Sequence, residues 1–336
     1  MEPLILFAIV VGFFATYLTM PFWIKKAKQI GLVWQDMNKV NHPKNVAGSG
    51  GLIVLFGAVL SILVYVAINV FIFKTGEEIL IKIFVLLTVL FLSALVGLID
   101  DLFGWQKGGL SARSRMILIL IAAIPLMVIN AGSSNVILPF FGFLELGIWY
   151  PLLFIPIGII GATTTYNFLA GYNGLEAGQG MILLIALAIV TYLTGNAWLS
   201  IIALCMVASL FGFYIFNRSP ARVFPGDVLT YTVGALIASI AILGNIEKIA
   251  ILFFIPYIIE TILKSRGKLV KHSFAKVNPD GSLEMPYRKI YGLEHLAIKI
   301  LKKIKHDGKA YENEVVYLIH GFQIVIILIT FLTMII

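Results

Sequence analysis

Long apolar runs alternate with short polar segments along almost the whole chain. Ten of these runs approach the ~20 residues that a helix needs to cross a bilayer core. They fall at Pro3 to Ile24, Gly51 to Phe73, Leu80 to Ile99, Met116 to Asn130, Pro151 to Tyr166, Met181 to Thr194, Ala197 to Phe216, Val228 to Leu243, Ile249 to Leu263 and Val315 to Ile336. The pattern predicts an all-α integral membrane protein with about ten transmembrane helices. The fourth and sixth runs are short, so nine and eleven helices remain alternatives.

The polar segments between the runs predict how the chain is organised. We expect one polytopic membrane domain over residues 1–336, with a cytoplasmic insertion at about 265–313. The longest segment on the other side, Ala131 to Tyr150, is apolar and broken by glycines, which predicts a small hairpin at the membrane surface.

The distribution of basic residues predicts the orientation. Of the 25 Lys and Arg residues, 22 lie in segments that follow odd-numbered runs. Cytoplasmic loops carry the excess of Lys and Arg, so these segments are expected in the cytoplasm and both termini outside. The cell membrane and an endomembrane both agree with this topology.

Composition narrows the class of protein. The chain is 60% hydrophobic with a mean hydropathy of +0.98, too apolar for one soluble core. The single cysteine, Cys205, lies in an apolar run, which excludes disulfides and a cysteine metal cluster. The net charge of +8 is explained by membrane orientation, so we expect membrane lipids and no nucleic acid as partners.

The stretch Asn167 to Gly180, NFLAGYNGLEAGQG, concentrates polar groups and glycines between two apolar runs. Asn167, Asn173 and Glu176 offer amide and carboxylate oxygens, and the glycines let the backbone approach a ligand closely. The pattern fits a phosphate, sugar or metal site; a plain interhelical loop is the alternative.

Two acidic positions stand next to cytoplasmic arginines. Asp100 and Asp101 are expected to end the third helix, where adjacent carboxylates repel each other and need a divalent cation or an Arg such as Arg115. Asp227 follows Arg222 and precedes a helix, so it is either a helix cap or a ligand for Mg²⁺ bound to phosphates.

The first and last cytoplasmic segments supply further polar groups. Asp36, Asn38 and Lys39 precede a Gly-Ser-Gly-Gly helix start, which fits either anion binding or close helix packing. Lys271 and His272 lie in a basic stretch that could contact lipid headgroups or a pyrophosphate. His295 follows Glu294 on an amphipathic helix and is expected at the surface.

Several of these motifs, in this order, resemble the polyprenyl-phosphate N-acetylhexosamine-1-phosphate transferases over nearly the whole chain. They are Asp36-Met37-Asn38-Lys39, Asp100-Asp101, Gly109 to Arg113, Asn167 with Ala170 to Glu176, and Arg222 to Asp227. The amino-acid sequences of the central stretch and of Gly281 to Met285 are similar to those of the eukaryotic and archaeal branch. This branch comprises the dolichyl-phosphate N-acetylglucosamine-phosphotransferases that begin N-glycosylation.

The resemblance implies transfer of N-acetylglucosamine 1-phosphate from UDP-N-acetylglucosamine to a polyprenyl phosphate such as dolichyl phosphate, with release of UMP. It implies Mg²⁺, or Mn²⁺ in its place, held by Asn173 and Asp227. Asp100, Asp101 and Asp227 are the implied catalytic residues, with the first two serving the acceptor phosphate or its deprotonation. The candidate substrate-binding residues are Asp36, Asn38, Lys39, Arg115, Asn167, Glu176, Arg222, Lys271 and His272.

The chain departs from the family pattern at several positions. Gly104 stands where bacterial members often carry a third aspartate, Arg115 where lysine is usual, and Lys271-His272-Ser273 matches an Arg-His-Arg motif only loosely. Bacterial-type transfer to undecaprenyl phosphate and a secondary transporter remain alternatives. The sequence leaves open whether the transfer passes through a covalent enzyme intermediate or occurs by direct displacement. It also leaves open whether the chain forms a homodimer.

Overall fold

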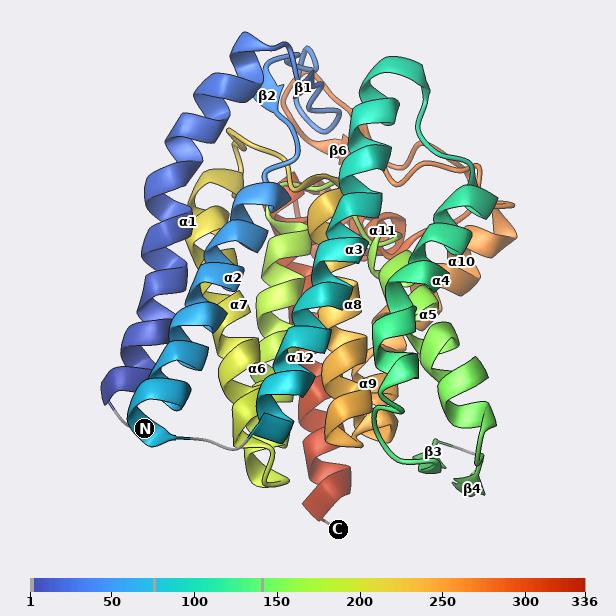
Figure 1. Cartoon of the computed structure of the whole chain (residues 1–336). Helices are drawn as coiled ribbons and strands as arrows, with labels where there is room; N and C mark the ends of the chain where they lie inside the picture. The colour runs from blue at the N-terminus through green and yellow to red at the C-terminus, as the bar shows by residue number, and fades with distance from the viewer. Residues whose placement is uncertain (1–2, 75–76, 140–141, 336) are drawn as a thin grey trace.

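The computed structural model describes residues 3–74, 77–139 and 142–335, and its helices form a bundle (Figure 1). Within these residues, seven helical segments are long and apolar enough to cross a membrane. They are α1 (Pro3–Gln29), α2 (Gly51–Ile68) continued by the π-helical turn η1 (Asn69–Phe73), α3 (Glu77–Lys107), α6 (Leu175–Leu193), α7 (Ala197–Asn217), α8 (Gly226–Gly244) and α12 (Glu312–Ile335).

The three other predicted spans are shorter or interrupted helices. They are α4 (Ala112–Val128), the pair η2 (Tyr150–Phe154) and α5 (Ile155–Tyr166), and the pair α9 (Glu247–Phe253) and α10 (Ile255–Arg266). The break between α9 and α10 lies just before Pro256, whose ring and missing N–H disrupt a helix. The predicted helical membrane protein is confirmed, whereas the count of ten spans stays a prediction.

The two ends of the bundle differ. The start of α1, the end of α12 and the hairpin of β3 (Asn135–Leu138) and β4 (Gly142–Glu145) lie at one end (Figure 1). This antiparallel hairpin was predicted. At the other end β1 (Val33–Trp34) pairs with β2 (Val46–Ala47), and β5 (Lys276–Val277) pairs with β6 (Leu283–Glu284) ahead of α11 (Leu293–Ile304).

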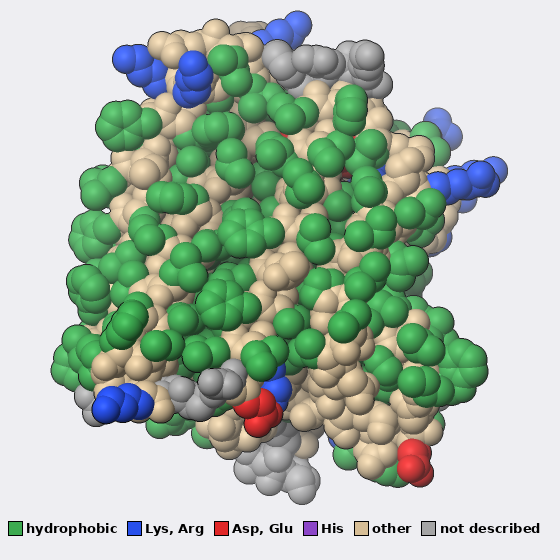
Figure 2. Space-filling model, viewed as in Figure 1, with side chains coloured by type: hydrophobic (Ala, Val, Ile, Leu, Met, Phe, Trp, Pro, Cys, Tyr) green, Lys and Arg blue, Asp and Glu red, His purple; other side chains and the backbone are tan. Residues whose placement is uncertain are grey.

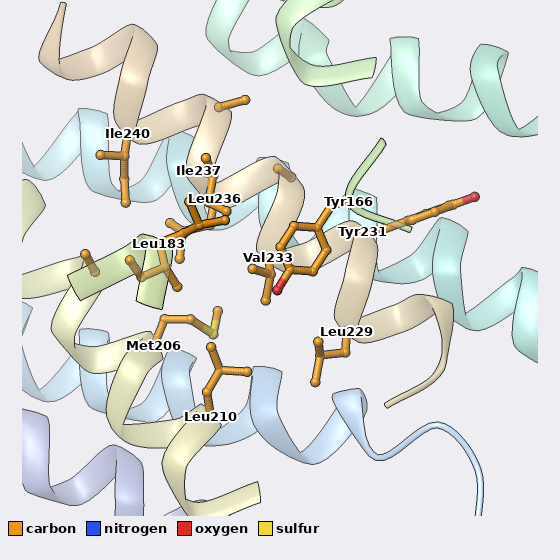
Figure 3. Close-up of a cluster of buried hydrophobic side chains, with 14 of the residues drawn as sticks. Tyr166, Leu183, Met206, Leu210, Leu229, Tyr231, Val233, Leu236, Ile237 and Ile240 are labelled. Carbon is orange, nitrogen blue, oxygen red and sulfur yellow. The ribbon is translucent and has the colours of Figure 1, made fainter. Parts of the chain in front are cut away.

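Helix α8 is the centre of the bundle. Every residue of α8 from Val228 to Gly244 is buried, and its apolar side chains pack against Leu183 of α6 and Met206 of α7 (Figure 3). Gly97 lets α3 approach closely, since a Cβ there would lie 2.4 Å from the carbonyl oxygen of Asp227. Small residues at a crossing permit such close packing of membrane helices.

The outer surface agrees with a membrane environment. Figure 2 shows apolar side chains over most of the visible face, with the basic side chains mainly near one end. Among the large apolar side chains exposed on the bundle are Phe22 and Phe71. So broad an apolar surface is unfavourable in water and is what lipid chains cover.

Candidate active site

A cleft of about 380 Å³ opens at the end of the bundle that carries β1 and β2. Its walls come from the first interhelical loop, the ends of α3, α4, α5 and α6, and the start of α8. The lining includes seven candidate residues from the sequence analysis, namely Asp36, Asp100, Asp101, Arg115, Asn167, Glu176 and Asp227.

Asp101 is held by the start of α8. Its Oδ1 atom accepts a 2.7 Å hydrogen bond from the backbone amide of Asp227, and its Oδ2 atom accepts one of 2.8 Å from Ser49. Gly226 makes this approach possible, because a Cβ there would lie 2.1 Å from Oδ2 of Asp101. Both carboxylate oxygens of Asp101 are therefore engaged in joining α2, α3 and α8.

Asp100 is compensated by a cation, as expected. Its Oδ1 atom accepts a 2.6 Å hydrogen bond from the amide of Leu110, and Nε of Arg115 lies 3.2 Å from its Oδ2 atom. The predicted helix end is wrong, since α3 continues to Lys107. Asp100 and Asp101 therefore lie inside the helix, where its carbonyl ends do not face them.

Asp227 differs from the other two aspartates. Within the described residues its carboxylate accepts no hydrogen bond from a donor, and the neighbouring acidic group is Asp100. The capping alternative is not observed, because α8 begins at Gly226 and Pro225 precedes it as the cap residue. Two adjacent carboxylates repel each other unless a proton or a cation lies between them.

Asp100 and Asp227 are suited to bind a divalent cation that also binds a phosphate group of a substrate. No cluster of three or more His, Cys, Asp or Glu side chains suited to a metal occurs in the described chain. Mg²⁺, however, is usually bound by one or two carboxylates together with phosphate oxygens. Asp227 offers an uncommitted carboxylate of this kind in the cleft.

The central glycine-rich stretch forms a turn and the first turns of α6. Gly171, at φ +101°, donates its amide to Oε1 of Glu176 at 2.8 Å, and Gly174, at φ +82°, precedes the helix. The other oxygen of Glu176 is buried without a partner. Asn167 accepts a 3.0 Å hydrogen bond from Thr230. Residues 175–180 are helical, so only the first part of Asn167 to Gly180 is an interhelical segment.

The first interhelical loop is fastened to this turn. Nδ2 of Asn173 donates to Oδ2 of Asp36 at 2.9 Å, and Nδ2 of Asn38 donates to the carbonyl of Gly171 at 2.9 Å. Asn38 also accepts from the amide of Ala275 at 3.1 Å. Asn173 and Asn38 thus join loops beside the cleft rather than line it.

Lys39 makes a contact that the sequence did not reveal. Its ammonium group forms an ion pair with Glu312 at the start of α12. The other oxygen of Glu312 accepts a 2.9 Å hydrogen bond from the amide of Asn173. Glu312, like Ser49 and Thr230, supports the site without belonging to a recognised motif.

The Gly-Ser-Gly-Gly start of α2 serves packing rather than anion binding. The amides of Gly50 and Gly51 donate to the carbonyls of Phe224 and Pro225, each at 2.9 Å. A Cβ on Gly51 would lie 2.4 Å from the amide nitrogen of Leu229. These glycines bring α2 against the segment that leads to Asp227, and both amides are already used.

Besides Asn38, Lys39 and Asn173, three further candidate residues lie outside the lining of the cleft. The guanidinium of Arg222 lies 4.7 Å from the ring centroid of Phe216, and the ammonium group of Lys271 lies 4.8 Å from that of Tyr287. His272 is exposed, 6.5 Å from the ring of Phe274, which lines the cleft.

The prediction of a surface histidine at position 295 is wrong. His295 and Glu294 are fully buried where α11 packs near Lys264. Burial raises the pKa of Glu294 to about 7 and lowers the pKa of His295 to about 4. The amphipathic pattern of α11 was read correctly, but these two residues belong to its buried face.

The fold and the cleft define a membrane-embedded enzyme with three aspartates and one arginine at one end of a helical bundle. The chain belongs to glycosyl transferase family 4, whose model matches residues 83–245. It is 33% identical to a Saccharolobus solfataricus protein and 31% identical to one from Sulfolobus acidocaldarius, covering 95% of this chain and 93% of each relative. Both relatives bear the name UDP-N-acetylglucosamine--dolichyl-phosphate N-acetylglucosaminephosphotransferase.

A bacterial relative is also similar. The phospho-N-acetylmuramoyl-pentapeptide-transferase of Streptococcus thermophilus is 30% identical over 76% of this chain and 77% of its own length. The two archaeal relatives match over more of both chains.

Proposed function

We propose that this protein transfers N-acetylglucosamine 1-phosphate from UDP-N-acetylglucosamine to a polyprenyl phosphate of the dolichyl type. The products are polyprenyl-diphospho-N-acetylglucosamine and UMP. The main support is a cleft in which Asp100, Asp101 and Asp227 converge. The chain that forms it is similar over 95% of its length to two relatives named for this activity.

The reaction exchanges one phosphoanhydride bond for another. An oxygen of the acceptor phosphate attacks the phosphorus that carries the sugar, the bond from that phosphorus to the bridging oxygen breaks, and UMP leaves with that oxygen. Asp100, which Arg115 and the amide of Leu110 hold in place, is suited to orient the acceptor or to take its last proton. Asp101 positions the start of α8 through the Asp227 amide.

We further propose that Asp227 holds Mg²⁺, or Mn²⁺ in its place. Asn173, which the resemblance implied as a second ligand, lines a neighbouring cavity rather than the cleft. When bound, such a cation neutralises charge on the phosphates during transfer. Support comes from the carboxyl group of Asp227, which faces that of Asp100 in the cleft, so that a proton or a cation is needed between the two.

A second cavity suits the acceptor's hydrocarbon chain. A groove of about 300 Å³ follows α5, α8, α9 and α10, and among the described residues Glu247 is the one ionisable residue in its lining. The same two helices, α5 and α8, border the cleft, since Asn167 follows α5 and Asp227 lies in the first turn of α8. We propose that the polyprenyl chain lies in this groove with its phosphate at the cleft.

The proposed topology has ten crossings, both termini outside and the cleft on the cytoplasmic face. The start of α1 and the end of α12 lie at the same end of the bundle, which agrees with an even number of crossings (Figure 1). The 22 basic residues of the odd-numbered segments agree with a cytoplasmic position for the other end.

A transfer assay tests the proposal. Purified protein in detergent, with Mg²⁺, radiolabelled UDP-N-acetylglucosamine and dolichyl phosphate, should move label into the organic phase and release UMP. Asp100→Asn and Asp227→Asn should each lower the rate at least about 100-fold, since each removes a charge in the cleft. UDP-N-acetylmuramoyl-pentapeptide with undecaprenyl phosphate is the comparison substrate pair.

The outcomes separate the alternatives. Faster transfer with the comparison pair would favour the bacterial-type reaction. If a folded protein moves no label with any UDP-sugar, the transferase proposal fails, and uptake into liposomes would then test transport.

A further inference from the structure

A second polar cavity of about 580 Å³ lies beside the active site and shares none of its lining residues. It is formed between the end of α7, the segment that follows it and the start of α12. Its lining includes the polar and aromatic residues Tyr214, Arg218, Ser219, Arg222, Asn313 and Tyr317. Asn173 also lines this cavity, whereas the cleft with the three aspartates and the proposed acceptor groove have none of these residues in their linings.

Two arginines give the cavity an uncompensated positive charge. In the described part of the chain, neither Arg218 nor Arg222 forms an ion pair, and both are exposed. The nearby carboxylate of Glu312 is already paired with Lys39. The guanidinium of Arg222 rests on the ring of Phe216, which limits its freedom without neutralising it. Two arginines that share a cavity without a carboxylate favour a phosphate group, which they can bind in bidentate fashion.

The position of the cavity indicates where that phosphate comes from. It lies at the ends of two candidate membrane spans, because α7 ends at Asn217 and α12 begins at Glu312. Its lining combines apolar Ile215 and Val316 with polar Arg218 and Asn313. Tyr214 and Tyr317 also line it, and tyrosine is enriched at the membrane–water interface.

We propose that this cavity binds the phosphate group of a membrane phospholipid, with Arg218 and Arg222 on the phosphate and Tyr317 beside the glycerol backbone. The acyl chains then follow the apolar faces of α7 and α12. A free phosphate ion carries the same recognised group, so the test compares both sources.

Lipid retention tests this site independently of transferase activity. Wild type, Arg218→Gln/Arg222→Gln and the control Lys25→Gln/Lys26→Gln are reconstituted in nanodiscs of phosphatidylglycerol and phosphatidylcholine, then released for native mass spectrometry. The control removes two exposed charges at the end of α1, outside the cavity. Wild type and control should retain phosphatidylglycerol, and the arginine variant should retain at least tenfold less. A titration of each protein with inorganic phosphate and with glycerol 3-phosphate forms the second arm.

Each result decides the proposal. Lipid retention that depends on the arginines supports a phospholipid site. Phosphate binding that depends on the arginines, without lipid retention, keeps the phosphate site and rejects the lipid source. Equal binding by all three proteins overturns the proposal. Since Arg222 packs on Phe216, the single variant Arg218→Gln and a melting curve distinguish loss of the site from loss of the fold.

Discussion

The amide of Asp227 donates a hydrogen bond of 2.7 Å to Oδ1 of Asp101, so one aspartate of the cleft fixes the backbone of another. This contact links the end of α3 to the start of α8, two segments far apart in sequence. The contact uses the backbone of Asp227, and its side chain instead faces the carboxyl group of Asp100 in the cleft.

Gly226→Ala should damage the site while leaving the bundle intact. Gly226 has φ +70°, and an added Cβ would lie 2.1 Å from Oδ2 of Asp101, so Asp101 must move. Displacement of a catalytic group by about 1 Å can cost about 100-fold in rate. The transfer assay should show a fall in kcat of this order. Gly321→Ala is the control, since nothing lies within 4 Å of a Cβ there; equal activity of the two variants would contradict the prediction.

Arg115→Ala should lower kcat by about 10- to 100-fold, because a hydrogen bond to a charged group contributes about 1.5–3 kcal/mol. Arg115 lies 3.2 Å from Asp100 and also donates to the carbonyl of Leu110 at 3.1 Å. Arg115→Lys keeps the charge and should retain more activity than Arg115→Ala. In an Asp100→Asn background, Arg115→Ala should have little further effect, and an undiminished effect would show that the two residues act separately.

Lys39→Met should destabilise the protein more than Lys39→Met/Glu312→Gln does. Removing Lys39 leaves the buried carboxylate of Glu312 without its cation, which costs about 3 kcal/mol when one partner of a buried pair is lost. The double variant removes both charges. Melting temperatures in detergent for the two single variants and the double variant check this; additive losses would mean that the ion pair contributes little.

The sequence predicted the parts of the site that depend on chain topology. Apolar runs alternate between the two directions across the bundle, so loops after odd-numbered runs share one end. This placed Asp36, Asp100, Asn167 and Asp227 together, as the structure has them in one cleft.

Contacts between distant segments could not be predicted in the same way. Lys39 and Glu312 are 273 positions apart, and only the packing of α12 brings them together. Arg222 is five residues from Asp227, yet it faces a different cavity because Val223 bridges to Ala47 and fixes the direction of the chain. The burial of His295 likewise depends on which face of α11 meets the bundle.

Glu294 and His295 should affect the pH dependence of stability in opposite directions. Burial raises the pKa of Glu294 from 4.5 to about 7, so the folded state holds a proton that the unfolded state loses, and stability falls from about pH 4.5 to 7. Burial lowers the pKa of His295 from 6.5 to about 4, so stability rises from about pH 4 to 6.5. The two effects oppose each other at pH 4.5–6.5, by up to about 1.4 kcal/mol per pH unit each.

Single substitutions separate these two effects. Relative to wild type, the melting temperature of Glu294→Gln should lose a fall between about pH 4.5 and 7, and that of His295→Gln should lose a rise between about pH 4 and 6.5. Both residues face Lys264, whose charge favours the ionised carboxylate and the neutral imidazole. Lys264 is therefore kept unchanged in both variants. Parallel pH profiles in the two variants would contradict the assignment.

Gly161→Leu should weaken use of the polyprenyl acceptor without affecting the sugar nucleotide. Gly161 lines the apolar groove, and nothing lies within 4 Å of an added Cβ, so the first atom of a leucine side chain meets no neighbour there and the rest occupies space in the groove. The KM for dolichyl phosphate should rise about tenfold, whereas the KM for UDP-N-acetylglucosamine stays the same. Gly321→Leu is the matched control, a helical glycine with equally open space outside the groove. An unchanged KM for dolichyl phosphate in Gly161→Leu would place the hydrocarbon chain elsewhere on the bundle.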